Sequence, residues 1–199
     1  MQDGKVRAPT VTFPPAVRDV VEQEYANADV ILEYGSGGST GIAAQNADMT
    51  FSVETDTAWI QNMRAWLSAE GLMSKVVLHH ADIGPTKLWG KPKKFRARHL
   101  RKYWRYPRSV WERSDFVHPE VVLIDGRFRA SCFLWVMENI SRPTRVLFDD
   151  YATREDYHYV ERYQKPTTII DRMAVFDITR QTLPTSEWIR SIGPRMKSR

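Results

Sequence analysis

Residues 30–40 read VILEYGSGGST, an apolar run that ends in a cluster of glycines. The run Val30–Leu32 predicts a short buried strand, and Ser39 is of a type that can cap a helix extending to about Asn46. The glycines between them allow a sharp turn and let a ligand approach the main chain closely. The stretch therefore predicts a strand, a tight turn and a helix, with room for a ligand at the turn.

The rest of the chain repeats this alternation of strand and helix. Further strands are predicted at 49–53, 76–78, 121–124, 145–148, 167–170 and 174–178, and helices at 16–26, 55–70, 130–139 and 156–163. Strands that alternate with helices form a mostly parallel sheet with helices on both faces. The last two strands follow each other directly, so they form a hairpin and the last strand runs antiparallel. The expected fold is a doubly wound α/β domain with a seven-stranded sheet.

Length and composition indicate one globular domain. The chain has 199 residues, of which 42% are hydrophobic, and no biased or repetitive segment. A single domain over residues 1–199 is expected. No apolar stretch approaches the roughly 18 residues that span a bilayer, and the N-terminus lacks the apolar core of a signal peptide. With Cys132 as the only cysteine, no internal disulfide can form. We therefore expect a cytoplasmic protein that does not engage a membrane.

The positive charge is concentrated in one segment. Residues 84–113 hold eleven basic residues and one acid, which gives +10, whereas the remainder of the chain carries −5. The segment falls between the third and fourth predicted strands and is interpreted as an insertion. It also contains six aromatic residues, Trp89, Phe95, Tyr103, Trp104, Tyr106 and Trp111. Three interpretations stay open: a lid that attracts an anionic small molecule, a surface excursion whose aromatics pack on the sheet, and a nucleic-acid-binding element.

An acidic residue follows the second strand, where a nucleoside site requires one. Glu54 lies 19 residues after Gly35, at the end of the neighbouring strand. In folds of this kind an acid there accepts hydrogen bonds from the two ribose hydroxyls. The glycine turn and Glu54 together predict a pocket for an adenosine-containing compound.

Two residues near the turn favour a cofactor without phosphates. A dinucleotide site commonly has a third glycine three positions after the second, where this chain has Thr40. Glu33, two residues before the first glycine, would repel a pyrophosphate but could accept hydrogen bonds from an ammonium group. S-adenosylmethionine carries an α-ammonium and a sulfonium and has no phosphate. We therefore predict S-adenosylmethionine as the cofactor and disfavour an NAD-dependent oxidoreductase.

The same residues resemble the class I S-adenosylmethionine-dependent methyltransferases. Residues 33–37 resemble that family's E-x-G-x-G first motif, and residues 81–83 resemble the segment that frames the adenine. Asp125, at the end of the fourth strand, resembles the acid beside the transferred methyl group and is the candidate catalytic residue. The resemblance covers roughly residues 30–178 and implies the Rossmann-like methyltransferase fold. The cofactor contacts that it implies are Glu33, Gly35, Ser36, Gly37, Glu54, Asp82, Ile83 and Asp125.

Three aspartates, Asp125, Asp149 and Asp150, end the fourth and fifth strands, at the sheet edge where this fold binds ligands. They could hold Mg²⁺. They also resemble the metal triad of catechol-type O-methyltransferases, whose last ligand is an Asn where this chain has Asp150. The departure disfavours a metal, and we expect Asp149 or Asp150 to cap a turn and Asp125 to contact the cofactor. Arg127 and Arg129 follow closely, and either could pair with these acids or with an anionic substrate.

The methyl acceptor has to be inferred from the basic insertion. Methyl transfer from a sulfonium is an in-line displacement that depends mainly on holding the acceptor close and aligned. The insertion favours a small, anionic acceptor. Two alternatives stay open: an RNA or DNA acceptor bound by the same segment, and a module that binds the cofactor without turnover, because no catalytic base is evident.

Overall fold

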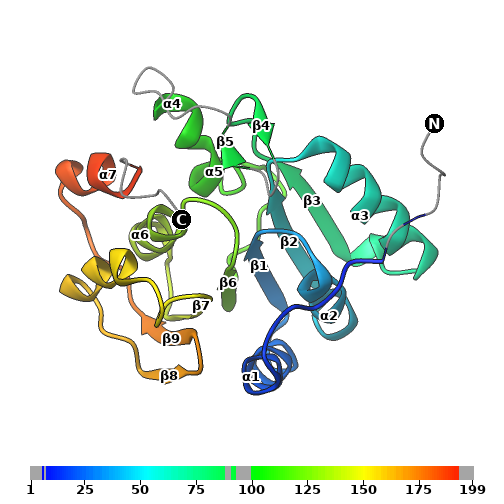
Figure 1. Cartoon of the computed structure of the whole chain (residues 1–199), viewed down its shortest axis with the longest axis horizontal. Coiled ribbons are helices and arrows are strands. Elements are labelled where there is room, and N and C mark those ends of the chain that lie inside the picture. Colours follow the sequence, from blue (N-terminus) through cyan, green and yellow to red (C-terminus); the bar gives the residue numbers. More distant parts are fainter. Residues whose placement is uncertain (1–5, 7, 88–90, 93–99, 193–199) are drawn as a thin grey trace.

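The computed structural model describes residues 6, 8–87, 91–92 and 100–192, and a seven-stranded sheet forms its centre (Figure 1). The strands are β1 (Val30–Tyr34), β2 (Met49–Glu54), β3 (Val76–His80), β6 (Val121–Ile124), β7 (Thr144–Phe148), β8 (Thr168–Ile170) and β9 (Met173–Ile178). They lie in the order β3-β2-β1-β6-β7-β9-β8. The strands from β3 to β7 are parallel, whereas β9 pairs antiparallel with β7 and β8. The predicted mostly parallel fold with an antiparallel last strand is confirmed.

Helices cover both faces of this sheet. They are α1 (Pro15–Tyr25), α2 (Gly38–Asn46), α3 (Thr57–Ala69), the 3₁₀ helices η1 (Met73–Lys75) and η4 (Glu155–Arg162), α6 (Arg129–Asn139) and α7 (Thr185–Ile192). Val21 of α1 shares one buried cluster with Ile31, and Phe133 of α6 shares another with Leu32. Consecutive residues of a strand point to opposite faces, so β1 is buried on both sides. Its continuous apolar sequence follows from this position.

The strand order reverses beside β1, and this reversal positions the site. From β1 the chain moves outward through β2 and β3, then returns to place β6 on the other side of β1. Residues of α2, which follows β1, and of α6, which follows β6, belong to clusters on opposite faces. A crevice is therefore left between the carboxyl ends of β1 and β6, where folds of this type bind ligands.

The basic insertion contributes a small hairpin and two short helices to the described structure. These are β4 (Thr86–Lys87), β5 (Lys91–Pro92), α4 (Leu100–Tyr103) and α5 (Arg105–Arg108). Tyr103 and Tyr106 are buried in the core, whereas Arg101 and Lys102 are exposed. Along α4 and α5, aromatic side chains thus face the core and cations face solvent. Six residues of the segment named above or counted in its charge lie outside the described residues: Trp89, Lys93, Lys94, Phe95, Arg96 and Arg98.

Two elements near the C-terminus differ from the prediction. The helix expected at 156–163 is a 3₁₀ helix, in which the N–H of Tyr157 donates to the carbonyl of Arg154. Helix α7 was not predicted. It is tied to α6 by a hydrogen bond of 3.1 Å between the hydroxyls of Ser131 and Ser191. A contact with a distant part of the chain therefore helps to hold α7 in place.

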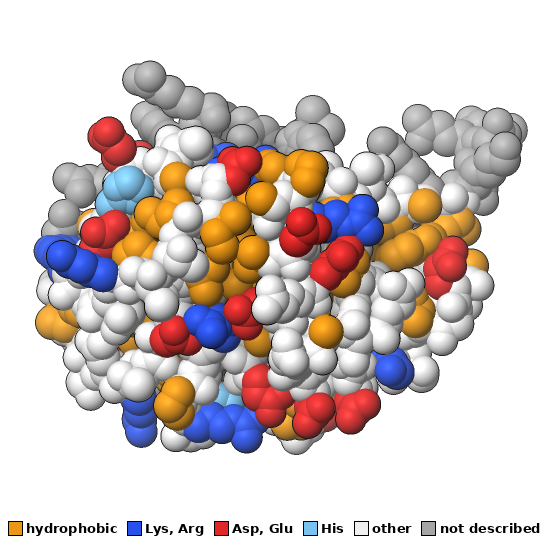
Figure 2. All heavy atoms as spheres, turned by 90° about the horizontal axis from the view of Figure 1, so that it is seen from below, with side chains coloured by type: hydrophobic (Ala, Val, Ile, Leu, Met, Phe, Trp, Pro, Cys, Tyr) orange, Lys and Arg blue, Asp and Glu red, His pale blue; other side chains and the backbone are white. Residues whose placement is uncertain are grey.

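The surface carries side chains of mixed type. On the face seen in Figure 2, acidic and basic side chains lie interspersed with hydrophobic ones. None of the helices in the described part of the chain is long and apolar enough to cross a bilayer.

Candidate active site

A cleft of about 570 Å³ opens at the crevice between β1 and β6. It is lined by residues 35–39 and 125–127, which follow these two strands, and by Glu54, Asp56 and Trp59 from the end of β2 and the start of α3. Tyr106 of α5 and residues 8–13 complete it. A concave site at the point where the strand order reverses is the default ligand site of this architecture. Of the predicted contacts, the cleft brings together Gly35, Ser36, Gly37, Glu54 and Asp125.

Two glycines allow the ends of β1 and β6 to meet beneath the cleft. Gly35 has a φ of +109°, and a Cβ there would lie 2.9 Å from the Cα and N of Gly126. A Cβ on Gly126 would lie 1.9 Å from the hydroxyl of Tyr106 and 2.8 Å from the carbonyl oxygen of Tyr34. A side chain at either position would displace backbone or the Tyr106 ring. The ends of β1 and β6 can therefore pack this closely because neither glycine carries a side chain.

The Glu54 carboxylate is held at the end of β2 by its own turn. Its Oε1 accepts hydrogen bonds from the N–H and hydroxyl of Thr55 and from the N–H of Asp56, the last at 3.1 Å. Among the residues that the structure describes, none donates to Oε2, which leaves one oxygen for a ligand. Trp59 donates its indole N–H to the carbonyl of Ser36 (2.8 Å) and so anchors the glycine turn.

The structure does not bring Glu33 into the cleft. Its side chain is fully buried, and its carboxylate accepts hydrogen bonds from the hydroxyls of Tyr25 (2.8 Å), Thr40 (2.6 Å) and Ser52 (3.4 Å). Burial raises the pKa of Glu33, and the hydrogen bonds oppose this shift. The carboxylate links β1 to α1, α2 and β2. The structure thus gives Glu33 a structural role beneath the turn, and its expected contact with a cofactor ammonium stays a prediction.

Asp82 and Ile83, predicted to frame the adenine, do not line the cleft either. Asp82 is exposed, accepts a hydrogen bond from the N–H of Gly84 (2.8 Å) and lies 3.7 Å from Arg105. Ile83 is buried in the cluster that contains Tyr106. The insertion contacts this segment, because Arg105 of α5 pairs with Asp82 and Tyr106 of α5 belongs to the same buried cluster as Ile83.

Residues 8–13 form a wall of the cleft that the sequence patterns did not indicate. Their backbone packs directly on α2, because a Cβ at Gly38 would lie 2.6 Å from the nitrogen of Val11. The segment forms neither helix nor strand, so no periodicity marked it. The one available signal is the alternation of Val11 and Phe13 with threonines between prolines, which is typical of extended chain.

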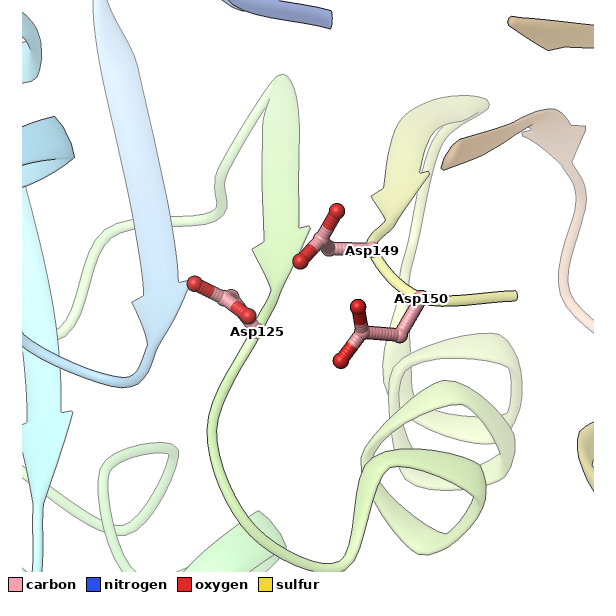
Figure 3. A group of neighbouring side chains, drawn as sticks. All are labelled: Asp125, Asp149 and Asp150. Carbon is pink, nitrogen blue, oxygen red and sulfur yellow. The ribbon is translucent and has the colours of Figure 1, made fainter. Parts of the chain in front are cut away.

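Asp125 lies at the end of β6 in a group of three carboxylates (Figure 3). One oxygen from each of Asp125, Asp149 and Asp150 lies within 4.8 Å of the others. Burial raises the pKa of Asp125 to about 7; Arg129 opposes the shift, whereas Asp149 and Asp150 add to it. Asp125 therefore changes its charge near neutral pH, unlike a solvated aspartate.

Arg127 and Arg129 have separate surroundings. Phe128 between them has a φ of +50°, which turns the chain. Arg129 is 4% exposed, and its guanidinium lies 2.8 Å from the carboxylate of Asp125. Arg127 lines the cleft and forms no ion pair with any residue in the described part of the chain. Of the two roles that the sequence left open, pairing with the acids falls to Arg129, and Arg127 borders the cleft.

The fold and the cleft match solved structures of methyltransferases. A methyltransferase-like protein of Silicibacter pomeroyi is 41% identical; the match covers 93% of this chain and 97% of that one, with a TM-score of 0.84. The O-methyltransferase TomG of Streptomyces achromogenes, solved with SAM, is 15% identical over 85% of this chain and 82% of its own (TM-score 0.56). An RNA methyltransferase of Salinibacter ruber, solved with S-adenosyl-L-homocysteine, is 16% identical over 88% and 97% (TM-score 0.52). The last two show the fold alone. No family model and no curated protein matches the chain.

The identity and coverage shared with the Silicibacter protein show more than a common architecture. The chain belongs to the class I S-adenosylmethionine-dependent methyltransferases. The resemblance that began with the glycine turn is thereby confirmed. Structures of the same fold include an O-methyltransferase and an RNA methyltransferase, so the family by itself does not select the acceptor.

The pKa of Asp125 predicts that cofactor affinity depends on pH. The carboxyl group loses its proton as the pH rises through about 7, and a carboxylate attracts a sulfonium more strongly than a neutral acid does. The dissociation constant for S-adenosylmethionine is therefore expected to fall roughly threefold or more between pH 6 and pH 8. Titration calorimetry at both pH values measures it, and Asp125→Asn should remove the difference. An unchanged pH dependence in that variant would contradict a place for Asp125 beside the cofactor.

Proposed function

We propose that the chain transfers the methyl group of S-adenosylmethionine to a small, anionic acceptor bound in the cleft between β1 and β6. The observation that carries the proposal is the composition of that cleft. It combines a glycine turn and Glu54, which suit a nucleoside cofactor, with Asp125 and Arg127. An arginine without an ionic partner in the described structure suits an acceptor that has a carboxylate or phosphate group.

The residues of the cleft fit S-adenosylmethionine. Glu54 offers one oxygen to ribose hydroxyls, while its other oxygen is held by its own turn. A Cβ at Gly37 would meet nothing within 4 Å, so open space lies beside the glycine turn. When bound, the cofactor supplies an already activated methyl group. Asp125 would stabilise the positive charge, and the cleft walls would hold the acceptor in line.

The walls and charges of the cleft favour a small acceptor. Trp59, Tyr106 and residues 8–13 enclose it, and a cleft of this volume holds a ligand of small-molecule size. Arg127 follows Asp125 by two positions and, like it, lines the cleft, close to the predicted position of the reacting methyl group. Arg101 and Lys102 of α4 are exposed on the insertion that also supplies Tyr106 to the cleft, and their positive potential would attract an anion.

Nucleic acid fits the described part of the insertion less well. Binding of a single strand commonly uses exposed aromatic rings on which bases stack. Tyr103 and Tyr106 are each 1% exposed, so their rings are closed to a base. Arg105 and Arg108 already lie within ion-pair distance of acidic residues. The small acceptor is therefore the preferred candidate, and RNA becomes an outcome of the test.

Labelled methyl transfer tests the proposal. The enzyme is incubated with methyl-labelled S-adenosylmethionine and either a metabolite extract or total RNA. Label is expected in small molecules that an anion exchanger retains. For the acceptor so identified, Arg127→Met should raise KM about tenfold with a smaller change in kcat. The reason is that the substitution removes the ion pair between the Arg127 guanidinium and the anionic group of the acceptor. Arg142→Met, on an exposed arginine paired with Glu120, is the control. Label in RNA alone, or no transfer despite cofactor binding, would contradict the proposal.

Glu54→Gln is expected to weaken cofactor binding about 10- to 100-fold. Hydrogen bonds to a charged group contribute about 1.5–3 kcal/mol, and the substitution removes the charge while it keeps the size of the side chain. Titration calorimetry measures the dissociation constant. Glu70→Gln, an exposed residue at the end of α3, is the matched control. If Glu54→Gln bound the cofactor with wild-type affinity, a contact between the Glu54 carboxylate and the ribose hydroxyls would be contradicted.

A further inference from the structure

The three aspartates at the ends of β6 and β7 have the arrangement of a cation site. Figure 3 shows the carboxylates of Asp125, Asp149 and Asp150 gathered around a common space. Oxygens that lie within 4.8 Å of one another can be bridged by one divalent ion. Mg²⁺ prefers such oxygen ligands, so the donor set by itself would suit a metal.

Arg129, however, already contacts all three carboxylates. Its Nη2 lies 2.8 Å from Oδ1 of Asp125. Its Nη1 lies 3.2 Å from Oδ2 of Asp150 and 3.8 Å from Oδ2 of Asp149. A permanently charged guanidinium therefore stands where a metal would need to coordinate these oxygens, and the residues present do not fit a divalent ion.

The guanidinium is also held by the backbone. Nε donates to the carbonyl of Gly126 (3.1 Å), Nη1 to that of Asp149 (2.5 Å) and Nη2 to that of Asp125 (2.6 Å). Together with the hydrogen bond from Nη2 to Oδ1 of Asp125, these bonds give acceptors to four of the five N–H groups of the guanidinium, and Nη1 also lies 3.2 Å from the carboxylate of Asp150. Arg129 is 4% exposed, so water does not replace these partners. Moving the side chain aside would leave buried donors and acceptors unpaired, which is costly.

Two further arginines complete the charge balance. Arg172 donates to both carboxylate oxygens of Asp149, at 2.8 and 3.0 Å. Arg154 donates to the carboxylate of Asp150 at 2.5 Å. Three guanidinium groups thus face three carboxylates. A divalent ion would enter a cluster that has no surplus negative charge to hold it.

We propose that the guanidinium of Arg129 takes the position of a divalent metal ion among Asp125, Asp149 and Asp150, so that this methyltransferase works without Mg²⁺. The inference concerns the cluster itself and holds for any acceptor. A metal in such a place would lower the pKa of an oxygen acceptor. Without one, the acceptor has to be nucleophilic at neutral pH by its own chemistry or lose its proton to a side chain of the cleft.

Binding of Mn²⁺ tests this proposal, with the free ion measured by electron paramagnetic resonance. The wild-type protein is expected to leave Mn²⁺ free up to about 1 mM, the range of weak protein sites for divalent ions. Arg129→Met opens the cluster and should bind one Mn²⁺ at least about tenfold more tightly than the wild type. Mn²⁺ should also raise the Tm of this variant and leave that of the wild type unchanged. Arg142→Met, which removes an exposed arginine from a single carboxylate, should behave as the wild type does.

Two results would overturn the proposal. One is saturable binding of Mn²⁺ to the wild type that Asp149→Asn abolishes. The other is a folded Arg129→Met that gains no affinity for Mn²⁺. Should Arg129→Met fail to fold, the wild-type titration decides alone: saturable binding overturns the proposal, and its absence up to about 1 mM supports it.

Discussion

Gly126→Ala is expected to lower the free energy of unfolding by about 3 kcal/mol, the upper part of the usual range for an overpacked core position. The new Cβ would lie 1.9 Å from the hydroxyl of Tyr106, 2.8 Å from the carbonyl oxygen of Tyr34 and 2.9 Å from the nitrogen of Gly35. Two of these atoms belong to the backbone at the end of β1, and the Tyr106 ring is buried. Because the φ of Gly126 is not positive, the cost is steric rather than conformational.

Urea unfolding followed by tryptophan fluorescence measures this change. Gly37→Ala is the matched control, since a Cβ there meets no atom within 4 Å and a φ of −172° is open to any residue. Its stability should stay within about 0.5 kcal/mol of the wild type. Adding Tyr106→Phe to Gly126→Ala removes the clashing hydroxyl and should recover part of the loss. Equal stability of the two glycine variants would contradict the packing of α5 on the strand ends.

Arg129→Met is expected to lower the free energy of unfolding by about 3–5 kcal/mol at neutral pH, because buried carboxylates lose their cation. The loss should grow as the pH rises. Arg129 lowers the pKa of Asp125, so its removal moves that pKa further above the value in the unfolded chain. A carboxyl group with a raised pKa stabilises the folded state below its unfolded pKa, and this contribution is lost as the pH rises through about 7. The variant should therefore be nearest to the wild type at low pH.

Urea titrations near pH 5 and pH 8 compare the two proteins. Arg142→Met removes an exposed ion pair with Glu120 and should cost less than about 1 kcal/mol at either pH. A loss in Arg129→Met that is the same at both pH values would show that packing, and not charge, is what the arginine supplies. In that case the cluster would not depend on a cation.

The strands were predictable because burial leaves a simple pattern in the sequence. Residues 121–124 are four consecutive apolar residues, and all four are buried in β6. Helix α7 gave no comparable pattern. Its contacts join Ser191 to Ser131, 60 positions away, and Glu187 to Arg162, 25 positions away. An element supported by such distant partners cannot be identified from its local sequence.

Glu33 shows how a motif residue can be found while its surroundings are missed. Along β1, Leu32 and Tyr34 face the cluster under α6, so Ile31 and Glu33 point to the other face, toward α1 and α2. That alternation is present in the sequence and already places the carboxylate on the face of the sheet opposite to Leu32 and Tyr34. Its partner Tyr25 comes from α1, whose orientation no local pattern specifies. The position of the residue was therefore predictable, and its hydrogen bonds were not.

The two arginines after β6 also show that the local sequence does not specify the surroundings of a side chain. Arg127 and Arg129 are of one type and only two positions apart, so the sequence assigned both the same alternatives. The positive φ of Phe128 separates their directions. That conformation is uncommon for a phenylalanine, and the Phe128 ring packs against the rings of Tyr103 and Tyr106. The residue that separates the two arginines thus packs against the insertion, which is distant in the sequence.

The wall that residues 8–13 add to the cleft bears on how the protein should be produced. An affinity tag or fusion partner placed ahead of Met1 would be joined to the chain seven positions before Ala8, the first residue of this wall. Apparent affinities measured on such a preparation would include any contact between the added peptide and this wall. If the affinity tag is placed at the C-terminus, or is removed before any titration, an effect of the added peptide is not mistaken for a property of the enzyme.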